Sequence, residues 1–375
     1  MPKSTNSPSK ATQSGPFSRR RSKLARALKS KGADALLVSD PVNVAYLTGF
    51  RGDSSELLVT KSRSLLLSDG RFTDQVAEEC PGLDAVIRGT GESMTKAITK
   101  TLKKLGCRAI GFERAYLTVA RHEALKEALP SAEWVGLENM VEDLRQIKDR
   151  EEIAQIREAI AFAERAFGIL RASLRLSDTE KSLADDMEHY LRRSGATQCA
   201  FPSIIAAGRR AALPHAIPTD QPIGESEFVL IDWGAKGTFY HSDLTRVLVT
   251  RKISRKFAKI YETVQKAQSQ AIDAIRPGVT AGDVDAVARG VIEKAGHGSA
   301  FSHSLGHGIG MAVHEGPGLR RGSETVLEPG MVVTVEPGIY LNDWGGIRLE
   351  DDVLVTKDGH EVLTSVPKHL EETVV

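Results

Sequence analysis

Two segments in the second half of the chain share one pattern, and this pattern restricts the folds that the sequence can adopt. Each segment reads as an apolar strand that ends in a carboxylate, a turn, and a second strand that carries another carboxylate. The sequences are V-L-I-D-W-G followed by H-S-D-L-T-R-V-L-V, and V-T-V-E-P-G followed by G-I-R-L-E-D-D-V-L-V, with the acids Asp232, Asp243, Glu336 and Glu350. An acid at the end of an apolar strand is costly to bury unless a cation lies beside it. The pattern therefore predicts that the four acids converge on bound cations.

The same region carries an internal repeat. A long amphipathic helix is predicted over residues 149–174, and residues 177–179 open a second helix that ends near Gly195. Residues 278–280 open a similar helix that ends near Gly296, and a carboxylate-bearing pair of strands follows each time. A pseudo-twofold α+β domain would bring the two strand pairs together. It would then converge the four acids at its centre.

The run H-S-L-G-H-G-I-G-M-A-V-H-E-G-P supplies three histidines, His303, His307 and His314. Its glycines argue against a helix and suit a backbone that passes close to metals or substrate. Four carboxylates and one imidazole, that of His307, suit a pair of divalent ions, with Mn²⁺ expected and Co²⁺ or Zn²⁺ as alternatives. Two ions about 3.5–4 Å apart would lower the pKa of a shared water. The other two histidines are then candidates for contacting the substrate or moving protons.

The first part of the chain has a different organisation. Between residues 21 and about 140, strands and helices alternate, which predicts an α/β domain of about 120 residues without a chemical cluster. A domain boundary near Lys148 separates residues 21–147 from residues 148–375. The first 33 residues contain no Asp or Glu and many Lys, Arg and Ser, so a disordered basic tail is expected, especially over residues 1–20. An organelle-targeting peptide is the alternative.

Composition excludes several classes of partner. The net charge of +1 provides no field that would attract nucleic acid or an acidic membrane. No apolar run approaches the roughly 20 residues of a membrane span. The three cysteines have no metal or redox spacing, and no signal peptide is visible, so a reducing, cytoplasmic location is expected.

These motifs resemble those of the Xaa-Pro peptidase family, which includes Xaa-Pro dipeptidase and aminopeptidase P. The family shares the pita-bread fold with methionine aminopeptidase and creatinase. The most specific matching pieces are A-L-P-H-A, V-L-I-D-W-G, S-D-L-T-R, H-S-L-G-H-G-I-G-M-A-V-H-E, V-E-P-G-I-Y and G-I-R-L-E-D-D-V-L-V. The first domain resembles the creatinase-like N-terminal domain, with residues 43–49, N-V-A-Y-L-T-G, similar to a strand motif of that domain.

The resemblance implies a role for each metal-site residue. Asp232 would hold one metal ion, and His307 and Glu336 would hold the other. Asp243 and Glu350 would bridge the two ions. Glu336 would also act as general base for the attacking water. No ligand position departs from the family pattern, which argues against a creatinase and against the non-catalytic proteins of this fold.

The resemblance also implies the residues that meet the substrate. His215 and His314 would contact the substrate carbonyl and stabilise the tetrahedral species. His303 would line the site near the proline. Arg348 would orient neighbouring groups and meet a substrate carboxylate.

The implied substrate is a peptide with proline in second position. A dipeptidase and an aminopeptidase would use the same metal ligands, so the ligands do not distinguish these two hypotheses. The presence of only two domains favours the dipeptidase. A methionine-type aminopeptidase would need the same ligands, but the extra first domain and the strand with Arg348 count against it. A non-catalytic peptide-binding protein is disfavoured by the complete ligand set. A homodimer is expected, because dimers are common among the relatives.

Overall fold

The computed structural model describes residues 15–375, which divide into two compact units between Leu144 and Arg145. This division falls a few residues before the boundary expected near Lys148. None of the helices within residues 15–375 is long and apolar enough to cross a membrane.

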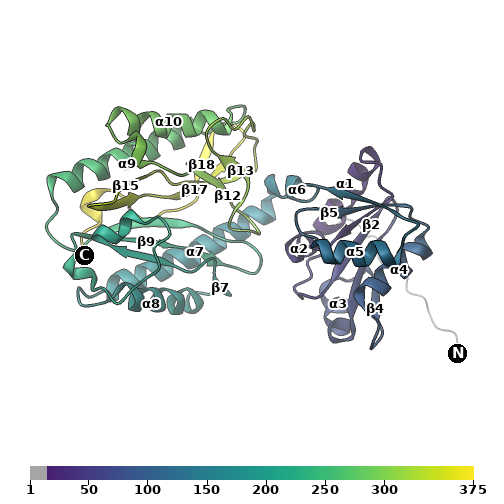
Figure 1. The fold of residues 1–375 in the computed structure, drawn as a ribbon. Helices are drawn as coiled ribbons and strands as arrows, with labels where there is room; N and C mark the ends of the chain where they lie inside the picture. Colours follow the sequence, from purple (N-terminus) through teal and green to yellow (C-terminus); the bar gives the residue numbers. More distant parts are fainter. Residues whose placement is uncertain (1–14) are drawn as a thin grey trace. The chain divides into compact units, whose positions relative to one another are not determined.

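The first unit is built on a six-stranded mixed sheet with helices packed on it (Figure 1). The strand order is β4 (Asp84–Arg88), β3 (Ser64–Asp69), β2 (Glu56–Thr60), β1 (Ala35–Val38), β5 (Ala109–Glu113) and β6 (Glu133–Leu137). The helices are α1 (Pro16–Ser30), α2 (Pro41–Thr48), α3 (Thr73–Glu79), α4 (Met94–Leu105), α5 (Val119–Ala128) and α6 (Glu142–Gln146). Strand β1, one of the two central strands, is antiparallel to β2 and parallel to β5. The alternation of strands and helices predicted from the sequence is confirmed.

The prediction of a disordered tail over residues 1–20 is wrong for its last part. Helix α1 begins at Pro16, where the fixed φ of proline suits the first helical turn. Leu24 and Leu28, one turn apart, are fully buried and fasten the helix to the unit. The basic residues of this segment therefore lie on a packed helix. The earlier part of the predicted tail lies outside the described residues.

The expected strand over residues 43–49 is also wrong, because this segment lies in helix α2. Asp40 caps the helix by accepting a hydrogen bond from the backbone N–H of Val42 at 2.9 Å, and Pro41 occupies the first turn. Gly49 ends the helix with a φ of 79°, a conformation that glycine adopts without strain. These start and stop signals outweigh the apolar, β-branched content of the segment.

The second unit consists of two similar halves, each with two helices followed by strands. The first half contains α7 (Arg150–Ser173), α8 (Glu180–Arg193), β7 (Gln198–Cys199), β8 (Ile204–Ala207), β9 (Phe228–Trp233), β10 (Ala235–Lys236) and β11 (Leu244–Val249). The second half contains α9 (Arg255–Ala274), α10 (Ala281–Lys294), β12 (Gly306–Gly308), β13 (Glu315–Leu319), β14 (Val332–Val335), β15 (Gly338–Leu341), β16 (Gly345–Arg348), β17 (Asp351–Val355) and β18 (His360–Val362). The main sheets have the orders β11-β9-β8 and β13-β12-β14-β17-β18.

The repeat predicted from the sequence is confirmed by the matching helix pairs. Helices α8 and α10 are each 14 residues long, and the threonines Thr179 and Thr280 cap them by accepting hydrogen bonds from the backbone N–H three residues later. Figure 1 shows that the two helix pairs enclose the strands of this unit. Helices α7 and α8 lie on one side of the strands, and α9 and α10 lie on the other. A β-bridge between Thr245 and Glu350 joins the two halves at the centre. The central position of this bridge places the acid-bearing strand ends next to one another.

Candidate metal and catalytic site

The four acids lie at the ends of buried strands. Asp232 belongs to β9, and Asp243 immediately precedes β11, its antiparallel neighbour. Glu336 follows β14, and Glu350 lies between β16 and β17. Every residue of β9, β11, β14 and β17 is buried. The apolar residues of these strands therefore fix the backbone from which the carboxylates project.

Three donor atoms form a compact cluster. Asp243, His307 and Glu350 each offer one ligand atom, and these atoms lie within 4.8 Å of one another. The Nε2 atom of His307 lies 3.4 Å from Oε1 of Glu336 and 3.7 Å from Oδ2 of Asp243. Four of the five predicted ligands therefore lie within a few ångströms of one another, namely Asp243, His307, Glu336 and Glu350.

The fifth predicted ligand, Asp232, lines the same cavity and is held by an arginine. Its Oδ2 atom accepts a hydrogen bond from Arg348 at 2.5 Å. Its Oδ1 atom is buried and has no hydrogen-bond partner within residues 15–375. An unsatisfied carboxylate oxygen in a buried acidic site is an open position for a cation.

The histidine in the cluster is oriented as a metal ligand. Nδ1 of His307 lies 3.1 Å from the carbonyl oxygen of Gly308, so Nδ1 carries the proton. Burial lowers the pKa of His307 to about 4, so the ring is neutral near pH 7. The lone pair of Nε2 then faces carboxylate oxygens, an arrangement that a cation between them would satisfy. The residues present therefore fit a divalent metal site.

The glycines of the histidine run have a packing role that the sequence did not predict. Strand β12 carries His307 between Gly306 and Gly308. A Cβ atom at Gly306 would collide with the carbonyl oxygen of Thr334, and one at Gly308 would collide with that of Gly316. The glycines thus allow close packing between strands, and the expectation that the run is not helical is confirmed.

Electrostatics give a physical reason for bound cations. Burial and mutual repulsion raise the pKa values of Asp243 and Glu350 well above their ordinary range. Burial also raises the pKa of Asp232 and that of Glu336, the latter to about 8. Arg348 supplies only one positive charge to this group. Without metal ions, the cluster therefore retains protons near neutral pH, and metal binding must displace them.

Metal-free protein is accordingly expected to lose stability as pH rises from about 5 to about 8. The folded chain keeps protons that the unfolded chain releases near its ordinary carboxyl pKa, so the folded state binds more protons across this window. The free energy of unfolding then falls by about 1.4 kcal/mol per pH unit for each such group. Thermal denaturation of EDTA-treated protein at the two pH values measures this effect, and saturating Mn²⁺ is expected to remove it. A midpoint independent of pH would contradict the expected protonation.

Three side chains form a chain of hydrogen bonds beside the cluster. Arg348 donates to the hydroxyl of Tyr340 at 2.9 Å, and Tyr340 lies 2.9 Å from Nε2 of His303. Nδ1 of His303 lies 2.7 Å from the carbonyl oxygen of Ser304 and so carries the proton. Burial lowers the pKa of His303 to about 4 and raises that of Tyr340 to about 12. The tyrosine therefore donates to a neutral His303, and the direction of every bond is fixed.

The remaining predicted residues face the same cavity, whose volume is about 490 Å³. His215 and His314 line it, together with His303, Arg348 and the five predicted metal ligands. The rings of His307 and His314 meet edge to face, with centroids 4.2 Å apart. The lining also contains apolar residues, namely Phe201, Pro202, Ile204, Pro214, Ile217 and Val313. The structure therefore brings all nine sequence-derived site residues together.

Sequence reasoning missed the hydroxyl groups that support the acids. Thr245 accepts a hydrogen bond from Nε of Arg348 at 3.1 Å and donates to Glu350 at 2.6 Å. Thr334 donates to Glu336 at 3.3 Å and accepts from the backbone N–H of His307. Thr245 and Tyr340 both lie inside motifs already singled out, S-D-L-T-R and V-E-P-G-I-Y. Their adjacency to the acids is the signal that could have found them.

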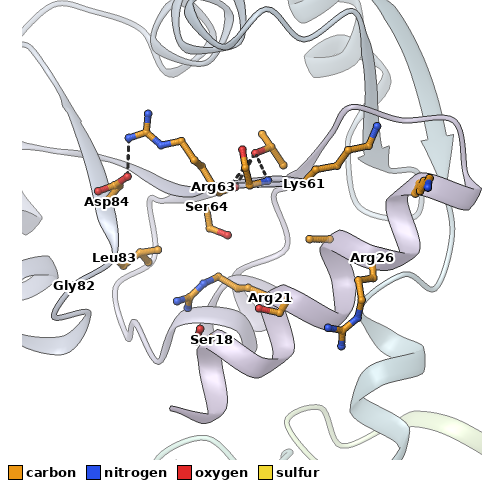
Figure 2. A pocket seen from close by; sticks show the side chains of 14 residues that line it. Ser18, Arg21, Arg26, Lys61, Arg63, Ser64, Gly82, Leu83 and Asp84 are labelled. Carbon is orange, nitrogen blue, oxygen red and sulfur yellow. Dashed lines mark hydrogen bonds and ion pairs between the residues drawn. The ribbon is translucent and has the colours of Figure 1, made fainter. Parts of the chain in front are cut away.

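A larger hollow in the first unit lacks comparable chemistry. It measures about 840 Å³ and is lined by basic and hydroxyl side chains from α1 and the β2–β3 turn, with Asp84 as its acid. Figure 2 shows the ends of Arg26, Lys61 and Arg63 pointing away from one another. Arg63 is already paired with Asp84 at 2.8 Å. These cations do not converge on a common point, so the hollow is a polar depression without a reaction centre.

A cluster of buried carboxylates and one imidazole beside a cavity defines a metal-dependent hydrolase. Residues 154–357 match the metallopeptidase family M24, and residues 20–147 match the creatinase/prolidase N-terminal domain. The chain belongs to metallopeptidase family M24. The resemblance stated from the motifs is thereby confirmed, as is the pita-bread fold with a creatinase-like first domain.

The similarity to known peptidases extends over nearly the whole of both chains. The structure of a Xaa-Pro dipeptidase from Bacillus anthracis is 37% identical, with a TM-score of 0.92 over 96% of this chain and 100% of that one. An X-Pro aminopeptidase from Thermotoga maritima is 34% identical, with a TM-score of 0.86 over 93% of this chain and 100% of that one. A Xaa-Pro dipeptidase of Pyrococcus furiosus is 34% identical over 93% of this chain and 98% of its own length.

Proposed function

We propose that this metallopeptidase uses two divalent metal ions to hydrolyse the bond between an N-terminal residue and proline, as a Xaa-Pro dipeptidase. The observation that carries the proposal is the cluster of Asp243, His307 and Glu350 beside the cavity lined by three further histidines. Asp243 and Glu350 would bridge the ions, Asp232 would complete one site, and His307 and Glu336 would complete the other. Mn²⁺ is the proposed metal, because oxygen-rich sites with a single imidazole suit it.

When bound, the ions supply a Lewis acid and lower the pKa of a water molecule. Glu336 then accepts the proton of that water as general base, with Thr334 holding one of its oxygens. The proton later passes to the nitrogen of the leaving proline.

His215 and His314 would stabilise the tetrahedral species by hydrogen bonding. Burial lowers the pKa of His314, so it is a neutral donor near pH 7. A neutral N–H group aimed at a developing oxyanion stabilises charge without releasing a proton. The cavity side formed by His303 and Arg348, which Tyr340 links by hydrogen bonds, would receive the proline end of the substrate, with Arg348 as the group that attracts its carboxylate.

The chemistry of the scissile bond supports the specificity. A bond before proline has no N–H, so a peptidase that grips that N–H cannot bind it. The site proposed here acts on the carbonyl side, and the apolar wall with Phe201, Pro202 and Ile217 suits the proline ring. The names of the similar proteins from Bacillus anthracis and Pyrococcus furiosus support the same substrate class.

The decisive experiment is mass-spectrometric analysis of products from Ala-Pro and Ala-Pro-Ala. EDTA-treated protein is expected to cleave neither peptide, and Mn²⁺ is expected to restore cleavage before proline, faster for Ala-Pro. Faster cleavage of Ala-Pro-Ala would identify an aminopeptidase instead. Release of methionine from Met-Ala-Ser with no action on Ala-Pro would contradict the proposal.

We also propose a homodimer in a reducing compartment. Support for the dimer comes from the resemblance to the Xaa-Pro peptidases. Support for the compartment comes from the thiols of Cys80, Cys107 and Cys199, all of which are free. Light scattering of the purified protein measures the mass, and a monomer at micromolar concentration would contradict the dimer.

A further inference from the structure

We infer that two buried carboxylates, each paired with an arginine, position the loops that carry His215 and His303. The pairs are Glu180 with Arg210 and Asp285 with Arg289. Neither pair touches the acidic cluster or lines the cavity. The inference rests on the proposed function, since it assigns these four side chains as positioning residues for that reaction.

Glu180, the first residue of α8, ties together the two ends of the loop that contains His215. Its side chain is fully buried. At the start of the loop, it accepts a hydrogen bond from the backbone N–H of Ala207 at 2.8 Å. At the end of the loop, it accepts from the backbone N–H of Thr219 at 2.9 Å and from the threonine hydroxyl at 2.7 Å. One carboxylate thus closes the whole segment between β8 and residue 219.

Arg210 extends this closure into the loop. Its Nε atom donates to both oxygens of Glu180, at 2.8 and 3.0 Å. Its NH2 group donates to the carbonyl oxygen of Ile217 at 2.6 Å. His215 is exposed, and its imidazole makes no hydrogen bond with other residues in the described part of the chain. Without such a bond, the loop backbone is the main support for its position in the cavity.

The second pair acts on the segment that carries His303. Arg289 donates to Asp285 through Nε at 2.9 Å and through NH2 at 2.7 Å. The same guanidinium donates to the carbonyl oxygens of Phe301 and His303, each at 3.0 Å. Asp285 accepts from the backbone N–H of Leu305 at 3.1 Å. The pair therefore holds the backbone on both sides of His303, directly before the strand of His307.

The two pairs are not copies made by the internal repeat. Glu180 is the first residue of α8, whereas Asp285 is the fifth residue of α10. In the first pair the arginine comes from the loop, and in the second it comes from the helix. A buried ion pair is weak evidence for a stabilising role, because an apolar pair is often as stable. What both pairs share is a set of hydrogen bonds to the backbone beside an active-site histidine.

Double-mutant cycles on kcat/KM for Ala-Pro test the inference. Glu180→Gln keeps the side-chain volume but presents an amide N–H to groups that are all donors. It is expected to lower kcat/KM about tenfold in the native background and less than about twofold in the His215→Ala background. In the His303→Ala background, the full tenfold loss is expected. Arg289→Lys is expected to show the reverse pattern, coupled to His303 and independent of His215.

The controls separate positioning from a general structural effect. Asp186→Asn changes an exposed acid on the same helix and is expected to leave kcat/KM unchanged. Equal losses from Glu180→Gln in all backgrounds would overturn the inference. If Glu180→Gln does not fold, Arg210→Lys keeps the charge, loses the bond to Ile217, and is expected to show the same coupling to His215 with a smaller loss.

A measurement without substrate separates this inference from the proposed function. NMR spectra of histidine-labelled, Zn²⁺-loaded protein are expected to show a shifted His215 signal in Glu180→Gln and a shifted His303 signal in Arg289→Lys. Unmoved signals would overturn the positioning role even if the peptides are cleaved. Shifted signals in a protein that cleaves no proline peptide would support positioning and reject the proposed function.

Discussion

Replacing Asp243 with alanine is expected to lower kcat/KM about a thousandfold or more. Its carboxylate lies in the donor cluster and is proposed to bridge both metal ions. Lewis-acid stabilisation by a bound metal contributes several kcal/mol to the transition state, and each 1.36 kcal/mol corresponds to about tenfold in rate. Glu350→Ala is expected to behave in the same way. Metal content by mass spectrometry and kcat/KM for Ala-Pro measure the effect together.

The same substitution is expected to stabilise the metal-free protein. Asp243 is buried, and burial and repulsion from Glu350 raise its pKa well above the ordinary range. Removing it relieves that repulsion, so the denaturation midpoint at pH 8 is expected to rise in EDTA while activity disappears. Asp358→Ala, which changes an exposed acid in the β17–β18 turn, is the matched control. Activity like that of the native protein in Asp243→Ala, with metal bound, would reject the assigned site.

Replacing His314 with alanine is expected to reduce kcat about a hundredfold while both metal ions remain bound. The ring stands next to His307 and lines the cavity, but the donor cluster is complete without it. Loss of one preorganised oxyanion donor costs about 10²–10³ in rate. Steady-state kinetics with Ala-Pro, combined with metal analysis, separate a catalytic effect from a ligand effect.

His189→Ala provides the control for this experiment. His189 is an exposed residue on α8 whose ring meets that of Tyr190 edge to face, and it is absent from the cavity lining. Its removal is expected to leave kcat within about twofold of the native value, as for an ordinary surface change. Loss of metal in His314→Ala would show that His314, and not His307 alone, is a ligand.

The acid-bearing strands could be predicted because two signals agreed. The apolar runs that end in Asp232 and Glu336 specified buried strands, and the repeated helix pair specified how two such runs meet. Five ligand-type residues at these positions left few arrangements other than convergence. The arrangement of the catalytic unit and its five candidate ligands were therefore accessible from the sequence pattern, whereas the roles of His215 and Arg348 came from the resemblance to the Xaa-Pro peptidases.

Other features depended on contacts that a sequence pattern does not encode. The basic segment after Pro16 forms a helix because Leu24 and Leu28 are buried against the unit, which charge composition does not show. The supporting roles of Thr245 and Tyr340 arise across strands, from partners about a hundred residues away in the first case and eight in the second. Local propensity reports neither kind of contact, because tertiary packing decides them.

The β-bridge between Thr245 and Glu350 has a consequence for how the protein matures. Asp232 and Asp243 come from one half of the catalytic unit, and His307, Glu336 and Glu350 come from the other. Neither half contains the full proposed ligand set, so tight metal binding would require that both halves have folded and docked. An ion that binds only the completed pair of halves would act as a late, long-range cross-link, and its binding energy would add to that of the docked state. The rate of metal uptake during refolding therefore measures the rate at which the halves assemble.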